Sequence, residues 1–246
     1  MENSSLVDRI LYRDAMMLII DKPAGLAVHE GGQGGPSLRP MLDQLTFGLP
    51  RPPELAHRLD RDTSGCLVLG RHRKALADLG ALFAEGKIKK TYWALTVGAP
   101  GNVGDEGLID RPLKKIDNRR GKMAVAKPND KEGQPSQTKW KVLGKSPDGR
   151  TAWMELSPLT GRTHQIRVHL ASIGCPILGD RIYGAGTADL LAPQLCLHAR
   201  AVSVPLYKNK PAVSVEAEPP EHMREGLGAC GGVSPDLPSP EASQGS

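Results

Sequence analysis

Two short stretches of this 246-residue chain concentrate the side chains that can do chemistry. The first is residues 53–65, in which Asp60 and Asp62 stand among a histidine, two arginines and two hydroxyl groups. The apolar run at residues 66–69 follows directly. A polar loop held by a buried strand is a common position for catalytic residues, because the strand fixes the geometry while the loop supplies reactive groups. Taken alone, the same segment could also be a surface cluster of arginine and aspartate.

The second stretch begins at Leu159 and carries Arg162 at the start of a predicted helix. Apolar residues recur there at helical spacing: Ile166, Leu170 and Ile173. Thr163 is the expected N-cap, and Gly174 is the expected end. Free backbone N–H groups at a helix entrance, together with a guanidinium, favour an anion, either a phosphate or an ionised carboxylate.

The elements that must position these residues follow from periodicity and turn residues. Helices are predicted at residues 37–45, at 74–84 and from residue 163 onward. Strands are predicted at residues 9–12, 16–20, 66–69, 87–98, 123–126, 136–143, 153–156, 195–204 and 212–217. Domain boundaries also follow: a disordered N-terminus at residues 1–8, one catalytic domain at residues 9–220, and a disordered tail rich in acid, Gly, Pro and Ser at residues 221–246.

Charge indicates a polyanionic partner. Residues 1–220 hold 31 Lys/Arg and 23 Asp/Glu, and residues 111–145 alone hold eleven basic and three acidic residues. Such a run is typical of a nucleic-acid surface, although a solvated lysine-rich face has the same composition. The chain has only nine aromatic residues, which argues against a stacking platform for single strands.

The sequence offers no pattern typical of a metal or redox site. The four cysteines are too widely spaced for zinc or for a redox pair, and two histidines five residues apart, His164 and His169, diverge on a helix. No apolar run approaches membrane-spanning length, and no signal peptide is evident. We therefore expect a soluble, cytoplasmic protein.

Taken together, the motifs resemble those of the RluA family of RNA pseudouridine synthases. The motifs that carry the resemblance are His57-Arg58-Leu59-Asp60-Arg61-Asp62-Thr63-Ser64-Gly65, Lys90-Thr91-Tyr92-Trp93-Ala94-Leu95, Gly161-Arg162-Thr163-His164-Gln165-Ile166-Arg167-Val168-His169, Asp21-Lys22-Pro23-Ala24-Gly25, Gly174-Cys175-Pro176-Ile177-Leu178-Gly179-Asp180 and Leu197-His198-Ala199. The resemblance covers about residues 9–220.

This resemblance implies an α+β fold: a mixed, mostly antiparallel sheet flanked by helices, with a central active-site cleft. It also implies isomerisation of uridine to pseudouridine in a tRNA or rRNA stem-loop, with no cofactor or metal. No obligate protein partner is implied, so a monomer is expected. Matched to the family motifs, Asp60 is the catalytic aspartate, Tyr92 stacks on the target base, and Arg162 is the basic partner of the aspartate. Arg58 fills the space that the flipped nucleotide leaves. The remaining expected substrate-binding residues are His57, Thr63, His164 and Gln165.

The chemistry suits these residue types. An ionised carboxylate near the sugar can act as a nucleophile at C1′ or as a base at C2′, and the sequence leaves both roles open for Asp60. A uridine inside folded RNA must be flipped out to be reached. Many relatives carry an additional N-terminal RNA-binding domain, whereas this chain starts almost at once with the catalytic motifs. RNA recognition is therefore expected from the catalytic domain and its basic region at residues 111–145.

Two other classes fit the sequence less well. A kinase-like phosphotransferase needs a nucleotide loop and His-Arg-Asp and Asp-Phe-Gly motifs, and these are missing. A non-catalytic RNA-binding protein is the stronger rival, since basic charge alone supports it. Such a protein has no use for the carboxylate of Asp60, which would repel phosphates.

Overall fold

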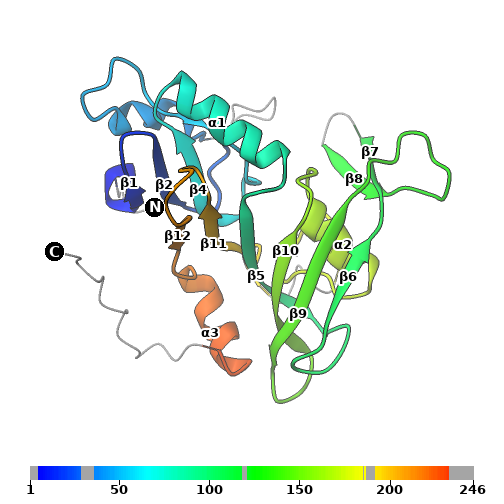
Figure 1. Cartoon of the computed structure of the whole chain (residues 1–246). Helices are drawn as coiled ribbons and strands as arrows, with labels where there is room; N and C mark the ends of the chain where they lie inside the picture. Colours follow the sequence, from blue (N-terminus) through cyan, green and yellow to red (C-terminus); the bar gives the residue numbers. More distant parts are fainter. Residues whose placement is uncertain (1–4, 29–35, 118–120, 185, 187–191, 233–246) are drawn as a thin grey trace.

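A computed structural model describes residues 5–28, 36–117, 121–184, 186 and 192–232 of the chain (Figure 1). Its helices are α1 (Arg73–Ala84), α2 (Gln165–Ser172) and α3 (Glu221–Ala229), with two 3-10 helices, η1 (Leu6–Arg9) and η2 (Arg39–Leu45). Its strands are β1 (Ile10–Arg13), β2 (Met17–Lys22), β3 (Glu54–Leu55), β4 (Ser64–Gly70), β5 (Lys89–Val97), β6 (Glu106–Asp110), β7 (Leu113–Asp117), β8 (Lys122–Val125), β9 (Gln137–Lys145), β10 (Thr151–Pro158), β11 (Leu197–Val204) and β12 (Val213–Glu216).

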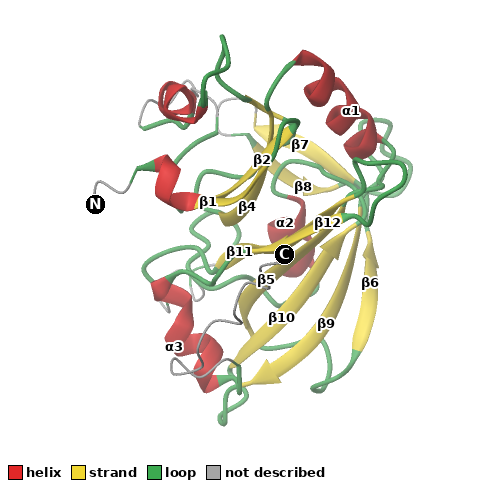
Figure 2. Cartoon of the chain, turned by 60° about the vertical axis from the view of Figure 1, so that its left-hand side comes forward, coloured by secondary structure: helices red, strands yellow, loops and turns green. Residues whose placement is uncertain are grey.

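Ten of these strands form one long, curved sheet (Figure 2). Its order is β1-β2-β4-β11-β5-β10-β9-β6, with β12 paired to β11 and β3 paired to β4. Every pair in it is antiparallel except β4 with β11. The remaining two strands, β7 and β8, form a separate antiparallel hairpin. The predicted fold class, α+β with a mostly antiparallel sheet, is confirmed.

The parallel pair joins the two halves of the sheet close to Asp60. Ser64 and Gly65 at the start of β4 lie opposite His198 and Ala199 of β11. Gly65 has φ +102°, and a Cβ atom on it would lie 2.3 Å from the carbonyl oxygen of Ala199. Only glycine allows this approach of the two backbones. The loop that carries Asp60 is thereby fixed beside β11 and, through it, beside β5.

Separate hydrophobic clusters lie on the two faces of the sheet. The apolar parts of β2 and β4 contribute to both clusters: Leu18, Ile20, Leu67 and Leu69 to the larger one, and Met17, Ile19, Cys66 and Val68 to the smaller one. Alternation along strands buried on both sides produces this division. The four cysteines are buried and free. Among the described residues, no helix is long and apolar enough to cross a membrane.

Both predicted disordered ends are partly wrong. Residues 221–229 form α3, and its Met223 and Leu227, together with Cys230, are buried. These three residues share one helix face, which packs onto the sheet with Gly226 against Leu95. The composition of the tail concealed this apolar spacing. At the other end Leu6 is buried in η1, while residues 1–4 and 233–246 lie outside the described part of the chain.

Other boundaries differ in informative ways. The helix predicted at residues 37–45 is the 3-10 helix η2, with a proline in its first turn and Leu38 rather than Ser37 as its N-cap. The third predicted helix, α2, begins at Gln165 and has His164 as its N-cap, so Thr163 does not cap it. Strands β3, β6 and β7 are additional to the prediction, because their short sequences lack a clear period. The other predicted strands and α1 are confirmed within a few residues.

Candidate active site

Asp60 lies on the loop between β3 and β4, whose backbone is held by hydrogen bonds. Its backbone oxygen accepts a hydrogen bond from Thr63 N at 3.2 Å. The next carbonyl, that of Arg61, accepts one from Gly25 N at 3.0 Å and another from Lys22 Nζ at 3.0 Å. The loop therefore has two backbone anchors close to the carboxylate.

Lys22 is fully buried, and its ammonium group organises this corner of the fold. Besides Arg61 O, the amine donates to Pro23 O at 2.8 Å and to Leu26 O at 2.9 Å. Burial lowers the pKa of Lys22 to about 8, against the opposing effect of nearby aspartates. Three carbonyl acceptors match the three hydrogens of an ammonium group, so the segment at residues 22–26 and the Asp60 loop are held together.

The cationic partner of Asp60 is Arg167, from the buried side of α2. Its Nη1 lies 3.6 Å from Asp60 Oδ2, and the two side chains are 6% and 17% exposed. The rest of the guanidinium binds Asp180 in a fork, with Nε to Oδ2 at 2.8 Å and Nη2 to Oδ1 at 2.7 Å. Burial raises the pKa of Asp180, but Arg167 and the backbone amides of Ile182 and Tyr183 together hold that pKa below its ordinary value. Asp180 thus orients the arginine that faces Asp60.

The predicted partner, Arg162, does not occupy this position. Its side chain is exposed, and its Nε donates a long hydrogen bond of 3.4 Å to Pro135 O. No ion pair among the described residues joins it to Asp60, although it lines the same cleft. Because α2 starts at Gln165, Arg167 lies in its first turn and on its buried side. The signal in the sequence was an arginine enclosed by Ile166 and Val168 in an otherwise apolar run.

His164, the N-cap of α2, also faces Asp60. Its Nε2 lies 3.9 Å from Asp60 Oδ2, and its Nδ1 lies 2.8 Å from the hydroxyl of Tyr183. The residue has φ +52°, a left-handed conformation that histidine adopts more readily than most residues. Burial lowers the pKa of His164, with Asp60 acting in the opposite direction, so the imidazole is neutral near pH 7. Tyr183 did not stand out in the sequence.

Tyr92 forms part of the cleft wall, on β5. Its side chain is buried and lies in the lining of the cleft with Asp60 and Leu197. Burial, followed by the charge of Asp60, raises the pKa of Tyr92, so the phenol stays protonated. The structure therefore brings this predicted residue into the site beside the aspartate.

Two other predicted substrate-binding residues, His57 and Gln165, line the cleft and form hydrogen bonds within the protein. The half-buried His57 accepts a hydrogen bond from Val68 N on Nε2 at 3.0 Å and stacks on Phe83 with ring centroids 4.5 Å apart. Burial lowers its pKa to about 3. Gln165 is buried, and its Oε1 accepts hydrogen bonds from Thr160 at 2.6 Å and from Arg162 N at 3.0 Å. These polar groups are used by the protein itself.

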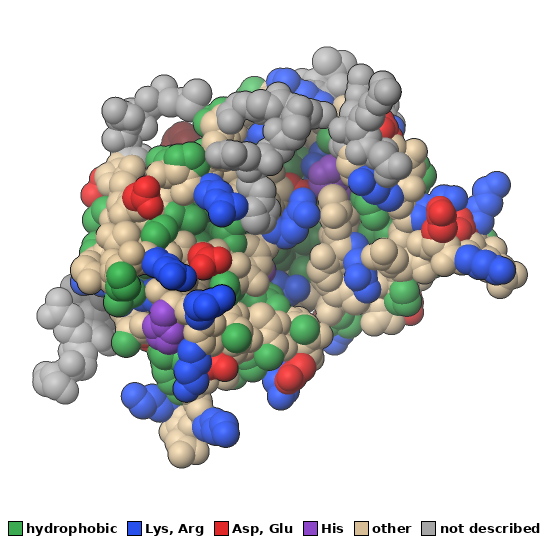
Figure 3. Space-filling view, turned by 90° about the horizontal axis from the view of Figure 1, so that it is seen from above, with side chains coloured by type: hydrophobic (Ala, Val, Ile, Leu, Met, Phe, Trp, Pro, Cys, Tyr) green, Lys and Arg blue, Asp and Glu red, His purple; other side chains and the backbone are tan. Residues whose placement is uncertain are grey.

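These residues surround one cleft of about 570 Å³. It opens between the end of α1 and the loop that joins β10 to α2, and Figure 3 looks onto this face, where Lys and Arg side chains gather around a hollow. Arg58, exposed at the rim, and the buried Thr63 also line it, as predicted. Lys90 does so as well, which sequence reasoning missed. Burial lowers the pKa of Lys90, and the cleft is basic around one central aspartate.

The arrangement suits an anionic substrate that presents a reactive carbon to a carboxylate. Cationic side chains come from three separate elements, while Tyr92 supplies a flat apolar surface. No group of three or more metal-ligating side chains occurs in the described part of the chain.

Residues 16–172 match the family model described as RNA pseudouridylate synthase. An uncharacterized RNA pseudouridine synthase of Zymomonas mobilis is 41% identical over 217 residues, covering 88% of this chain and 95% of that protein. The dual-specificity RNA pseudouridine synthase RluA of Salmonella typhimurium is 37% identical, covering 85% and 93%.

A solved structure supports the same relation. That of human RNA pseudouridylate synthase domain containing 4 aligns with a TM-score of 0.73 and 28% identity, over 91% of this chain and 93% of that one. Other relatives are longer: the chain spans 60% of a Synechocystis RNA pseudouridine synthase.

Proposed function

This chain belongs to the RNA pseudouridylate synthase family, whose members are isomerases acting on uridine in RNA, and we propose that it converts a uridine in a tRNA or rRNA stem-loop to pseudouridine with Asp60 as the acting carboxylate. The observation that carries the proposal is the Asp60 carboxylate, held by Arg167 at 3.6 Å inside a basic cleft. A carboxylate in such a groove repels RNA unless the chemistry uses it.

The reaction rearranges bonds without adding or removing atoms. The N1–C1′ bond of uridine breaks, the base rotates, C5 bonds to C1′, and the C5 proton is exchanged for one on N1. Asp60 either attacks C1′ or removes the C2′ proton, and both roles require an ionised carboxylate. Arg167 places a positive charge 3.6 Å from Oδ2 of this carboxylate.

The cleft walls suit a flipped nucleotide. Tyr92 presents an aromatic ring beside Asp60, on which a base extruded from a stem can stack. Arg58, exposed at the rim, can enter the space that this base leaves in the stem. Lys90 and Arg162 lie along the same walls, where they can bind backbone phosphates.

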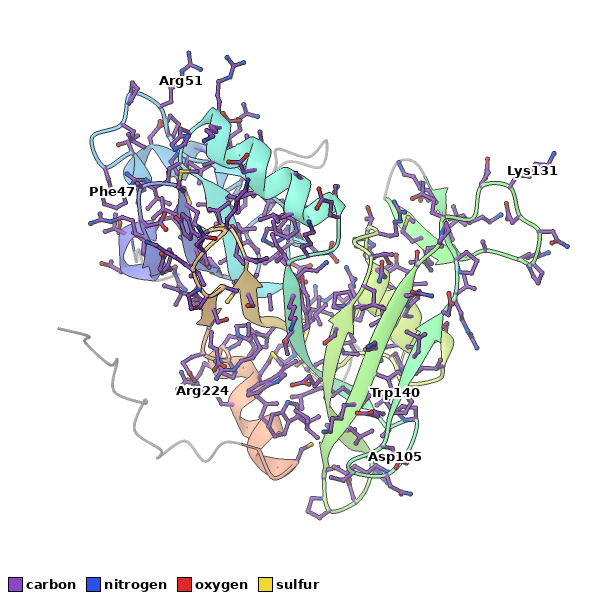
Figure 4. The ribbon with its side chains drawn as sticks, in the orientation of Figure 1. Phe47, Arg51, Asp105, Lys131, Trp140 and Arg224 are labelled. Carbon is purple, nitrogen blue, oxygen red and sulfur yellow. The ribbon has the colours of Figure 1, made fainter. Side chains whose placement is uncertain are left out.

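RNA outside the cleft is expected to contact the β7–β8 hairpin and the loop after it. Lys115 and Lys122 are solvent-accessible, and Lys131 points away from the body of the protein in that loop (Figure 4). Lys114 is less available, because its amine pairs with Asp130 at 2.7 Å. Replacing Lys115, Lys122 and Lys131 by glutamine should weaken RNA binding and reduce its dependence on salt, because binding through fewer phosphate contacts releases fewer counterions from the RNA. An unchanged salt slope would place the RNA elsewhere.

The direct test is incubation of the purified protein with total tRNA and rRNA from a strain lacking it, followed by site-resolved mapping of pseudouridine. Asp60→Asn should abolish product while RNA affinity is retained, because shape is kept and only the charge is lost. Asp62→Asn is the matched control, since Asp62 is on the same loop but pairs with Arg61. Pseudouridine formation by Asp60→Asn, or none by the wild type on any RNA, would contradict the proposal; binding without product would favour the non-catalytic rival.

A further inference from the structure

A chain of polar contacts runs from the β7–β8 hairpin to the carboxylate of Asp60. The backbone amide of Met123, on β8, donates to the Tyr183 hydroxyl at 3.0 Å. That hydroxyl lies 2.8 Å from His164 Nδ1. The opposite ring nitrogen, Nε2, lies 3.9 Å from Asp60 Oδ2. Three segments far apart in sequence thus meet at one tyrosine.

The proton positions in this chain follow from the donors and acceptors available. The Tyr183 oxygen accepts the Met123 amide hydrogen and has one hydrogen of its own to donate. Burial raises the pKa of Tyr183, so it remains a hydroxyl, and the described acceptor within reach is His164 Nδ1. A neutral histidine whose Nδ1 accepts carries its hydrogen on Nε2. That hydrogen faces Asp60.

Both groups facing Asp60 approach the same oxygen. Arg167 Nη1 is 3.6 Å from Oδ2, and His164 Nε2 is 3.9 Å from Oδ2. At these lengths the contacts are electrostatic rather than full hydrogen bonds, and such contacts commonly tighten when substrate binds. A guanidinium and an imidazole therefore hold the carboxylate from the side of α2.

Tyr183 is itself fixed firmly enough to direct its neighbours. Asp180 Oδ1 accepts hydrogen bonds from the backbone amides of Ile182 at 2.9 Å and Tyr183 at 3.1 Å. The guanidinium of Arg167 lies over the Tyr183 ring, 5.1 Å from its centroid. The ring also packs with Met123 and Val168 in a small apolar cluster between the hairpin and α2. One tyrosine therefore touches both groups that face the carboxylate.

We propose that Tyr183 is a positioning residue that holds His164 with its hydrogen on Nε2, so that His164 and Arg167 together fix the Asp60 carboxylate in the orientation from which it reacts with the sugar. The last step rests on the proposed function, whereas the placement of the proton does not. Because Met123 belongs to β8, the same contacts tie the carboxylate to the hairpin on which RNA is expected to bind.

The first test measures the proton directly and needs no substrate. In protein labelled with ¹⁵N-histidine at neutral pH, the His164 signals, assigned by their loss in His164→Asn, should show a protonated Nε2 and an unprotonated Nδ1. Tyr183→Phe removes only the hydroxyl, and should shift His164 toward a mixture of both tautomers. A proton on Nδ1 in the wild type, or a spectrum unchanged in Tyr183→Phe, would overturn the proposal.

The second test uses single-turnover kinetics on an RNA that the wild type modifies. Tyr183→Phe and His164→Asn should each lower the rate of the chemical step by about 10- to 100-fold with little change in KM, because small misplacements of a reacting group have effects of this size. His164→Gln should recover much of the rate, since its amide can place an N–H near the position of Nε2. Asn tolerates the left-handed backbone and so separates loss of the donor from loss of folding.

The matched control is Tyr207→Phe, which removes a tyrosine hydroxyl bonded to Asp14; neither residue lines the cleft, so the rate should be unchanged. A wild-type rate in Tyr183→Phe, or a His164→Gln rate no better than that of His164→Asn, would overturn the positioning role. A wild type inactive on every RNA would instead refute the proposed function, while the tautomer measurement would still decide the placement of the proton.

Discussion

Replacing Arg167 should affect the protein far more than replacing Arg162, although both belong to one motif. Arg167 is 6% exposed, and its fork binds an Asp180 side chain that is 1% exposed. Arg167→Met would leave that carboxylate buried without its cation, and breaking a buried pair in this way typically costs about 3–5 kcal/mol. Arg162 is exposed and makes one long contact, so Arg162→Met should cost less than about 1 kcal/mol.

The assay is urea unfolding at neutral pH, with turnover measured on the same preparations. Arg167→Lys should also lose turnover, since a point charge cannot bind Asp180 through two parallel hydrogen bonds and still face Asp60. Combining Arg167→Met with Asp180→Asn should destabilise by less than the sum of the single changes, because the second change removes the unpaired charge. Equal losses for Arg167→Met and Arg162→Met, in stability and in turnover, would refute this assignment.

Three further perturbations probe the scaffold. Burial lowers the pKa of His57 to about 3 and of His198 to about 4, so below pH 6.5 the unfolded chain binds protons that the folded chain does not. Each residue should therefore lower the free energy of unfolding by about 2 kcal/mol at pH 5, which urea midpoints at pH 7 and pH 5 would measure. His198→Asn should reduce this loss of stability between pH 7 and pH 5. Gly65→Ala should destabilise the protein more than Gly149→Ala. Both glycines have positive φ, which costs an alanine about 1–2 kcal/mol, but only at Gly65 would the new methyl group also collide with backbone atoms. Equal decreases in melting temperature would contradict the close approach of β4 and β11. Truncation after Gly226 should lower the melting temperature, because it removes the buried Leu227 and Cys230, whereas truncation after Gly232 keeps both; equal melting temperatures would show that this part of α3 adds nothing.

The basic outline of the site could be read from the sequence because its parts are short and local. The residues 57–65 form one turn before one apolar strand, so their proximity follows from chain connectivity alone. The amphipathic spacing of α1 and the β-prone run of β5 predicted the elements that carry Phe83 and Tyr92. These features depend on neighbours within a few residues, which periodicity and turn chemistry describe well.

The partner of Asp60 was decided by the tertiary structure. Arg162 and Arg167 are both arginines near one helix start, and the choice depends on which face of α2 turns inward and where the helix begins. Asp180, which orients Arg167, comes from a turn thirteen residues further along. The same holds for the hydrogen bonds of His57 and Gln165, which join these cleft-lining residues to Val68, Thr160 and Arg162.

Residue types and local motifs therefore determined the chemistry that this chain can perform: a carboxylate, cations and an aromatic ring in a basic protein. Which cation faces the carboxylate, which polar residues support the cleft and how far each end of the chain enters the core depended on the packing of distant segments. The parallel pairing of β4 with β11 places the Asp60 loop beside Tyr92, and the seating of α2 between the sheet and the β7–β8 hairpin brings Arg167, His164 and Tyr183 to it. Burial and through-space charge select among residues that look equivalent along the chain.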